Sequence, residues 1–390
     1  MPTHERSARP RIAHFAGSMH PGQDGVTRVL YRLIDALKDH GYQCLFVSPV
    51  VPPPSERPFA MHQVPSVAIP LYPDYRFALP GYGHFERTLR GFQPDILHIH
   101  SPCSLGMAAV QYGRKHGVPV VATYHTHFTS YAKYYRIRAL EGFGWNYLKG
   151  VYNRCQRTFV PSLPIKAELE GRGIQNLEYL PHGVDAESFH PRFSSAEWRG
   201  TISPEGRNIL LFAGRLVWEK DLRTLIGVYD LLRSRRRDWV LALAGDGPIR
   251  GELEAAMPDA KFLGHLVATE LSTAYASSDI FVFPSTTETF GNVMLEAMAS
   301  AVPPICSREG GACGVVEDGV TGFVTAPRDA ADITARVEFL LDHPDRRAEM
   351  ARSALAYARS QRWEAIFSRL FAAYDAVIRD FQQQERRKAA

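Results

Sequence analysis

The stretch NILLFAGRLVWEK (residues 208–220) joins a short apolar run to a basic turn. The run NILLFA has the length of one buried strand, and Gly214 allows a tight turn after it. Arg215 and Lys220 then precede a helical pattern that continues to about residue 236. A strand, a glycine turn and a helix in this order form the repeating unit of parallel α/β sheets. The stretch therefore predicts an α/β fold.

The same unit recurs along the whole chain, because apolar runs bounded by turn residues alternate with helical periodicity. In the first half we expect strands at 11–17, 43–49, 95–101, 118–125, 157–162 and 176–183. In the second half we expect strands at 208–214, 239–245, 261–265, 279–285 and 302–307. Helical patterns lie between most of these strands. The sequence predicts two doubly wound halves.

The chain has 390 residues, which exceeds the roughly 250–300 residues that one hydrophobic core usually serves. Two domains are therefore expected. The polar, turn-rich stretch 194–208 marks the predicted boundary, with domains at 1–198 and 199–370. The last helical pattern is long and amphipathic, so residues 371–390 are expected to cross back and pack on the first domain.

Composition restricts the class of protein. A net charge of +4 and a pI near 8.7 favour an anionic ligand only weakly. Five scattered cysteines without a CxxC pair indicate neither a disulfide framework nor a zinc site. No apolar run has the length of a membrane span, and residues 1–10 are too polar for a signal peptide. A cytoplasmic protein is expected.

The sharpest local motif is ETFGNVMLEAM (residues 288–298). Gly291 and Asn292 open a helix whose free amides can receive an anion, and Glu296 lies about one turn inside it. Glu288 precedes the helix and can bond sugar hydroxyls or balance a developing positive charge. A structural alternative, an acid that complements the helix dipole, explains Glu288 but gives Glu296 no role.

Other loops that follow strands carry phosphate-binding features. Arg215 and Lys220 stand before a helix, where two cations add to the positive N-terminal dipole and suit a diphosphate. The alternative is a solvated loop that happens to carry two cations. The glycines of GDGP (245–248) and EGG (309–311) offer backbone amides, and either segment by itself is also compatible with a simple turn.

Taken together, these motifs resemble the retaining glycosyltransferases of family 4. The resemblance rests on Arg215-x4-Lys220, Glu288-x7-Glu296, GDGP, EAMAS and EDGVTGF, and it covers nearly the whole chain from residue 24. It implies the GT-B fold, with two Rossmann-like domains facing a central cleft. The segments 124–135 and 181–193 resemble the branch of sulfoquinovosyl and mannosyl transferases that glycosylate lipids. The implied reaction is transfer of a hexose from a nucleoside-diphosphate sugar to a hydroxyl group, without a metal.

The resemblance assigns roles by position. Arg215 and Lys220 match the pair on the diphosphate, Glu296 the acid on the ribose, and Glu288 the residue at the donor sugar. His125 matches a histidine at the same sugar. The remaining matched positions line the donor: Gly25, Gly214, Phe290, Gly291, Asn292 and Val293. Ala301, Pro304 and GGACGVV (310–316) depart from the family pattern, so the phosphate-side loop is expected to differ in detail.

Since no carboxylate stands beside His125, we expect same-face attack, with the leaving phosphate accepting the proton of the acceptor. A buried structural histidine is the alternative for His125, and it is the favoured interpretation for His98 and His100, for which no metal is predicted. His127 is left open. A sugar-nucleotide epimerase and a non-catalytic nucleotide-sugar binder are the alternative functions. An oxidoreductase is disfavoured because no GxGxxG follows the first strand.

The acceptor side is predicted from residues 130–154, where aromatic residues alternate with Lys and Arg. This mixture suits a lipid-linked acceptor or an anionic membrane surface at the inner face of the cell membrane. The alternative is a helix whose aromatic face packs inward. The basic runs at 234–237 and 385–388 lack the aromatic pattern of a nucleic-acid site, so no nucleic acid is expected.

Overall fold

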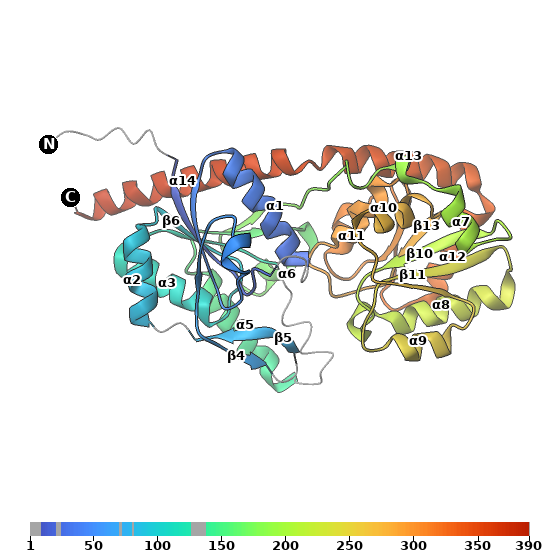
Figure 1. Ribbon diagram of the computed structural model, residues 1–390, viewed down its shortest axis with the longest axis horizontal. Coiled ribbons are helices and arrows are strands. Elements are labelled where there is room, and N and C mark those ends of the chain that lie inside the picture. The colour runs from blue at the N-terminus through green and yellow to red at the C-terminus, as the bar shows by residue number, and fades with distance from the viewer. Residues whose placement is uncertain (1–8, 21–24, 70–71, 80–81, 126–137, 390) are drawn as a thin grey trace. The chain divides into compact units, whose positions relative to one another are not determined.

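A computed structural model describes residues 9–20, 25–69, 72–79, 82–125 and 138–389, which form two compact units (Figure 1). Unit 1 contains residues 1–161, 166–180 and 364–390, and unit 2 contains residues 162–165 and 181–363. Each unit is built on its own parallel sheet. The predicted α/β class with two doubly wound halves is confirmed.

Unit 1 has a seven-stranded sheet in the order β3-β2-β1-β6-β7-β8-β9. Its strands are β1 (Arg11–Phe15), β2 (Gln43–Ser48), β3 (Ala60–Gln63), β6 (Ile96–Ile99), β7 (Val120–Thr123), β8 (Arg157–Val160) and β9 (Leu177–Tyr179). The helices are α1 (Gly25–Asp39), α2 (Tyr82–Phe92), α3 (Ser104–His116), α5 (Arg138–Tyr152), α6 (Leu163–Gly171) and α14 (Trp363–Ala389). Strand β3 and the antiparallel hairpin of β4 (Ser66–Ile69) and β5 (Tyr72–Ala78) were not predicted from the sequence.

Unit 2 has a six-stranded sheet in the order β12-β11-β10-β13-β14-β15. Its strands are β10 (Asn208–Ala213), β11 (Trp239–Ala244), β12 (Lys261–Gly264), β13 (Ile280–Phe283), β14 (Pro304–Ser307) and β15 (Phe323–Thr325). The helices are α7 (Ala196–Ile202), α8 (Leu222–Arg235), α9 (Arg250–Ala256), α10 (Ala268–Ala276), α11 (Asn292–Ala299), α12 (Ala330–Asp342) and α13 (Pro344–Ser360). The apolar runs of β10, β11 and β13 are buried along nearly their whole length, as strands with helices on both faces require.

The boundary between the units lies at Pro181 and not near residue 198. Val184 belongs to the hydrophobic core of unit 2. The carbonyl of Ser188 accepts a hydrogen bond from Ser272 Oγ at 2.5 Å, which ties the preceding segment to α10. The stretch expected to be a linker also contains α7, whose N-terminus is capped by the Ser195 hydroxyl. Because this stretch is polar, the sequence analysis did not predict the short capped helix.

The C-terminal helix returns to unit 1, as predicted, but it joins that unit from Glu364 and not only from residue 371. Ile366 and Phe367 are buried on the same helix face as Phe371, whose ring lies 4.9 Å from that of Tyr42 behind α1. Figure 1 shows α14 running beside α1 in this unit. The apolar stripe of this helix starts about one turn before residue 371, and its residues form one continuous packing surface.

Candidate active site

The predicted charged residues lie at the point where the strand order of the unit 2 sheet reverses. From β10 the chain adds β11 and β12 on one side, then crosses over to β13 on the other. The loops that leave β10 and β13 therefore diverge at the carboxyl edge of the sheet, which is where ligands of open α/β sheets bind. Arg215 and Lys220 follow β10, and Glu288 follows β13.

Lys220 and Glu288 form an ion pair across these two loops. Their side chains are 20% and 19% exposed, so the pair is shielded but reachable from solvent. Arg215 lies in the same loop as Lys220 and is exposed. A lysine paired with a carboxylate can exchange that partner for an anionic ligand, because a diphosphate offers more acceptor oxygens to the same donor.

A second carboxylate, which the sequence analysis missed, holds the two loops together. Asp221 is buried at the start of α8 with a left-handed backbone conformation, φ 54°. Its carboxylate accepts hydrogen bonds from the amide of Thr286 at 3.0 Å and from Arg328 Nε at 3.2 Å. An acid directly before a helix is usually taken as a cap, so the sequence signal points to the wrong role.

The glycine loops pack closely against their neighbours. A Cβ atom on Gly245 would stand 1.9 Å from the carbonyl oxygen of Gly214, and one on Gly311 would stand 1.8 Å from that of Thr289. The amide of Gly311 also donates to the carbonyl of Glu288 at 2.6 Å. Only glycine fits such backbone approaches. These loops are therefore more than simple turns, because they pack against the two segments that carry the charges.

Helix α11 begins as predicted, with Gly291 at φ 80° just before Asn292. The Oδ1 atom of Asn292 lies 2.8 Å from Nδ1 of His182, and the buried ring of Phe290 lies 4.7 Å from the His182 ring. Burial lowers the pKa of His182 to about 4, so this histidine is neutral at pH 7. His182 precedes Gly183 in a segment quoted for the resemblance, yet it was not predicted as a site residue. Val293 is partly buried beside Asn292.

Glu296 has a partner within unit 2. The residue is 6% exposed, and its carboxylate accepts a hydrogen bond from the Tyr275 hydroxyl at 3.1 Å. The sequence argument that a structural interpretation leaves this residue without a role is therefore wrong. A tyrosine hydroxyl occupies one acceptor site of a carboxylate and leaves others, so the bond is compatible with a ribose contact as well.

The two remaining predicted residues belong to unit 1. Gly25 is the first residue of α1, directly after residues 21–24, which are outside the described part. His125 follows β7 and is 9% exposed, with Nε2 located 3.0 Å from Nδ1 of His100. The buried environment expected under the structural interpretation is thus present, and His125 is also joined to the histidine of the neighbouring strand. His127 lies outside the described residues.

Three buried histidines, His14, His98 and His100, place ring nitrogens within 4.8 Å of one another, which is the spacing of a possible metal site. Hydrogen-bond geometry already engages both ring nitrogens of His98 and His100 and Nδ1 of His14. Nδ1 of His14 is 3.0 Å from Nε2 of His100, while His98 reaches the Tyr374 hydroxyl at 2.6 Å and the Thr123 hydroxyl at 2.8 Å. A metal would have to displace these bonds, so the donor set fits a hydrogen-bond network better.

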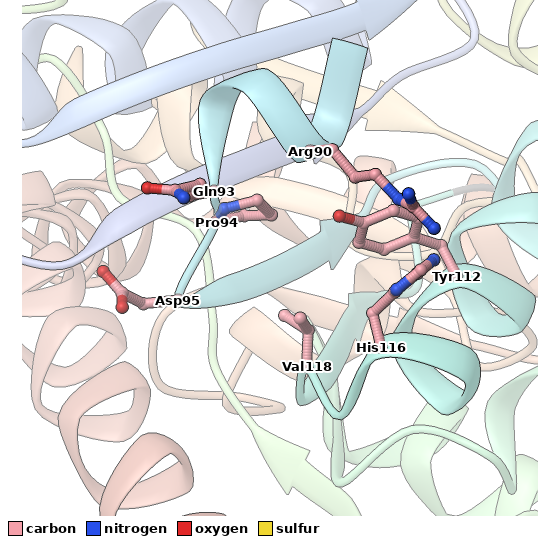
Figure 2. A pocket seen from close by; sticks show the side chains of 7 residues that line it. All are labelled: Arg90, Gln93, Pro94, Asp95, Tyr112, His116 and Val118. Carbon is pink, nitrogen blue, oxygen red and sulfur yellow. The ribbon is translucent and has the colours of Figure 1, made fainter. Parts of the chain in front are cut away.

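A separate hollow of about 470 Å³ lies where β6 and β7 begin (Figure 2). This is the amino edge of the unit 1 sheet, opposite to the carboxyl edge that carries His100 and His125. It is lined by the ends of α2 and α3 and by the residues before the two strands: Arg90, Gln93, Pro94, Asp95, Tyr112, His116 and Val118. The Asp95 carboxylate accepts the amide of Arg11 at 2.9 Å, and His116 is paired with Glu86. These groups serve the fold, so the hollow is not part of the candidate active site.

The predicted acceptor surface cannot be followed in full. Residues 126–137 lie outside the described part, including Tyr131, Lys133, Tyr134, Tyr135 and Arg136. In the remainder, Trp145 is buried and carries Arg172 over its ring at 4.8 Å, whereas Phe143 is 73% exposed. Tyr152 is buried as well, and the hydroxyl of Tyr147 donates to the carbonyl of Pro102 at 2.8 Å. Phe143 is therefore the exception to inward packing among the described aromatic residues of α5. Among the described helices, none combines the length and apolar character of a membrane span.

Family models match both halves of the chain. The model described as Glycosyltransferase Family 4 covers residues 23–188, and the one described as Glycosyl transferases group 1 covers residues 195–356. The two matches meet close to the boundary between the units. Each unit is thus recognised separately, and the pair appears in the order that the sequence motifs imply.

Relatives are similar over most of the chain or nearly all of it. A GDP-mannose-dependent alpha-mannosyltransferase of Corynebacterium glutamicum is 35% identical, over 94% of this chain and 89% of that protein. The sulfoquinovosyl transferase SQD2 of Arabidopsis thaliana is 35% identical over 72% of this chain and 56% of that protein. The crystal structure of Anabaena Alr3699/HepE in complex with UDP and glucose shares the fold, with a TM-score of 0.75, 17% identity and coverage of 94% and 100%. The chain is a glycosyltransferase of family 4 with the GT-B fold.

Proposed function

We propose that the chain transfers mannose from GDP-mannose to a hydroxyl group, with retention at the anomeric carbon. The observation that carries the proposal is the Lys220–Glu288 ion pair at the strand-order reversal of unit 2, with Arg215 in the same loop. This arrangement suits an anionic leaving group next to a polar sugar. The choice of mannose and guanine is supported by the relatives named as GDP-mannose-dependent mannosyltransferases.

In the proposed reaction the diphosphate of the donor replaces Glu288 as the partner of Lys220, and Arg215 shares the charge. The freed Glu288 then meets the sugar, and Glu296 accepts hydrogen bonds from the ribose. Departure of GDP increases the negative charge on the diphosphate, and preorganised cations stabilise that change most effectively. We propose that these side chains serve in place of a metal. The C–O bond to the acceptor forms on the face that GDP leaves, and the phosphate takes the acceptor's proton.

The family resemblance predicts that Gly25 and His125 also contact the donor, and we include both contacts in the proposal. The proposed acceptor is a glycolipid or lipid-linked glycan, because segments 124–135 and 181–193 resemble the branch that glycosylates lipids and because Phe143 is exposed on α5. Contact with an anionic membrane belongs to the same proposal. Flotation with liposomes that contain or lack anionic lipid tests it, and no binding at low salt would remove the membrane from the proposal.

The donor is tested by thermal-shift measurements with GDP-mannose, UDP-glucose, UDP-galactose and UDP-GlcNAc. GDP-mannose should raise the unfolding temperature most, because a ligand that binds only the folded state stabilises it by mass action. Transfer is then measured with radiolabelled GDP-mannose and lipid extracts, with anomeric configuration determined by NMR. An isomerised sugar nucleotide without any acceptor product would favour the epimerase, and stabilisation by UDP-glucose alone would replace the proposed donor.

A further inference from the structure

Arg328, in the loop between β15 and α12, contacts one side chain in each of three other loops of unit 2. Its Nε donates to Oδ1 of Asp221 at 3.2 Å, its Nη2 to Oγ1 of Thr286 at 2.8 Å and its Nη1 to Oε2 of Glu309 at 3.3 Å. These partners lie in the loops after β10, β13 and β14, and β15 is the next strand of the sheet. One guanidinium group therefore joins four adjacent loops at the carboxyl edge of the sheet.

The hydrogen bonds of the Thr286 hydroxyl have a fixed direction. A guanidinium group only donates, so this hydroxyl accepts from Arg328 and gives its single proton to Oδ2 of Asp221 at 2.5 Å. The same carboxylate oxygen also accepts the amide of Thr286 at 3.0 Å. Asp221 and Thr286 are 6% and 4% exposed. Arg328 and Asp221 together thus hold both the side chain and the backbone of Thr286 in a buried position.

The two buried partners of Arg328 are close in sequence to the charges of the candidate active site. Lys220 directly precedes Asp221, and Glu288 follows Thr286 by two residues. The geometry between Asp221 and Thr286 therefore also determines the separation of the backbone at Lys220 and at Glu288.

The third partner of Arg328 lies near the backbone of Glu288. Glu309 precedes Gly311 by two residues, and the amide of Gly311 donates to the carbonyl of Glu288 at 2.6 Å. The side chains of Arg328 and Glu309 are 50% and 41% exposed, and an exposed ion pair contributes little to stability. We therefore expect this pair to affect the placement of the loop after β14 more than the stability of the unit.

Both ends of the ion pair between Arg328 and Asp221 have a backbone conformation that favours glycine. Asp221 has φ 54° and Arg328 has φ 58°. Such conformations cost free energy and persist where the surrounding contacts hold them, which is common at ligand-binding sites. A solvated surface arginine would leave this strain uncompensated, whereas the three bonds of Arg328 offset it.

We propose that Arg328 is a positioning residue for sugar transfer, which keeps the loops of Lys220 and Glu288 at one separation while the donor is bound. The inference rests on the proposed function, in which the diphosphate replaces Glu288 as the partner of Lys220. The ion pair then no longer joins the two loops. The bonds of Arg328 involve neither of these charges, so they persist in the donor complex and hold Glu288 at the sugar.

Arg328→Lys separates the geometry of this side chain from its charge. A guanidinium group has five donors in a rigid plane, whereas an ammonium group is a point charge that cannot reproduce the same three directions. Arg233→Lys is the matched control. Arg233 is 53% exposed, pairs with Asp259 at 3.0 Å and lies in the last turn of α8, at the amino edge of the same sheet.

The first measurement is amide hydrogen exchange, followed by mass spectrometry, on the full chain without any ligand. In Arg328→Lys, the peptides that contain Thr286 and Gly311 should exchange about tenfold faster, because loss of a hydrogen bond to a charged group changes a local opening equilibrium by about that factor. Arg233→Lys should leave both peptides unchanged. Unchanged exchange in Arg328→Lys would overturn the proposal.

The second measurement combines steady-state kinetics with GDP-mannose and calorimetry with GDP. In Arg328→Lys, kcat should fall about 10- to 100-fold, since displacement of a reacting group by about 1 Å can cost about 10²-fold. The donor KM and the Kd of GDP should stay close to those of the unsubstituted chain, because the charge is kept. Lower stability with unchanged kcat would show a merely structural role. GDP binding weakened as much as kcat would show that Arg328 contacts the ligand itself, and either result overturns the proposal.

The two measurements keep this inference separate from the proposed function. If the unsubstituted chain transfers no sugar, the proposed function fails, while hydrogen exchange still decides whether Arg328 holds the loops. If Arg328→Lys does not fold, Glu309→Gln tests the exposed pair alone. Faster exchange is then expected in the peptide that contains Gly311, and unchanged exchange there would contradict the proposal.

Discussion

The two parallel sheets have related topologies, but charged side chains lie at the carboxyl edge of one and neutral side chains at that of the other. In unit 2, the loops that leave β10 and β13 carry a partly exposed ion pair, Lys220 with Glu288, and a buried carboxylate, Asp221. In unit 1, β1 and β6 are the strands at which the order reverses, and they lead to neutral histidines joined by hydrogen bonds. Topology thus determines where a ligand can bind on each sheet, and side chains determine which chemical groups that edge can recognise.

This difference predicts a difference in response to salt. Ionic interactions near solvent are screened by added salt, whereas hydrogen bonds between buried neutral groups are not. Substitutions of Lys220 and Glu288 in the unit 2 loops should change nucleotide affinity in a salt-dependent way. Substitutions of His125 and its partner His100 should change turnover at any ionic strength.

The largest effect is expected for Lys220→Met. Loss of one preorganised donor to a developing anion costs about 10²- to 10³-fold in rate, and kcat/KM with GDP-mannose should fall by at least that much. Steady-state kinetics at two salt concentrations provide the measurement. Lys261→Met at the exposed start of β12 is the control, since it removes the same charge at the opposite edge of the same sheet. Equal activity of the two variants would show that Lys220 does not bind the donor.

Glu288→Gln should separate binding from turnover. The substitution releases Lys220 from its internal partner, so GDP should bind at least as tightly as to the original chain. Turnover should nevertheless fall by about 10- to 100-fold, because the sugar loses a hydrogen bond to a charged group. Calorimetry with GDP and kinetics with GDP-mannose measure the two effects. Weaker GDP binding together with unchanged kcat would reverse the assigned roles.

Asp221→Asn should lower the stability of the protein more than its activity. The amide retains one acceptor oxygen but loses the charge that faces Arg328 and part of the bonding to Thr286. A partly unsatisfied buried group costs about 1–3 kcal/mol, which urea denaturation can measure. Asp230→Asn, on the exposed face of the same helix, is the control and should leave the unfolding free energy unchanged.

Acid should destabilise unit 1 through its neutral histidines. The pKa of His14 is lowered to about 3, so between pH 6.5 and 3 the unfolded chain binds a proton that the folded chain does not. Its contribution to stability is therefore fully present above pH 6.5 and is lost as the pH falls towards 3. One such group changes the unfolding free energy by about 1.4 kcal/mol per pH unit. His14→Phe should reduce the slope measured by urea denaturation between pH 6.5 and 5, and an unchanged slope would contradict neutral burial.

Several features of the fold were accessible from local sequence patterns. The apolar run at β10 and the amphipathic stripe of α14 each bury the residues expected, because periodicity reports directly which face of an element avoids water. Helix α7 was missed, since Ser195 caps a helix that is too short and polar to show a periodic pattern. The hairpin of β4 and β5 was missed as well, because Pro65 and Pro73 interrupt the local strand pattern.

For the site, sequence identified the charges but not their partners. Lys220 and Glu288 stand out by residue type and by their places after strands, whereas their pairing joins positions 68 residues apart. Asp221 looks like a helix cap and instead binds the loop after β13. Glu296 was taken to need a ligand, although Tyr275 on another helix supplies a bond.

The sequence by itself determined the two α/β halves, the positions of the strand-end loops and the charged residues in them, because each depends on neighbours within a few turns. Only the tertiary structure decided that His14, His100 and His125 form a chain, and that Tyr374 reaches His98 across 276 residues. Parallel strands bring distant segments into register at one edge of a sheet. Hydrogen bonds between their side chains therefore depend on the assembled sheet and leave no local pattern in the sequence.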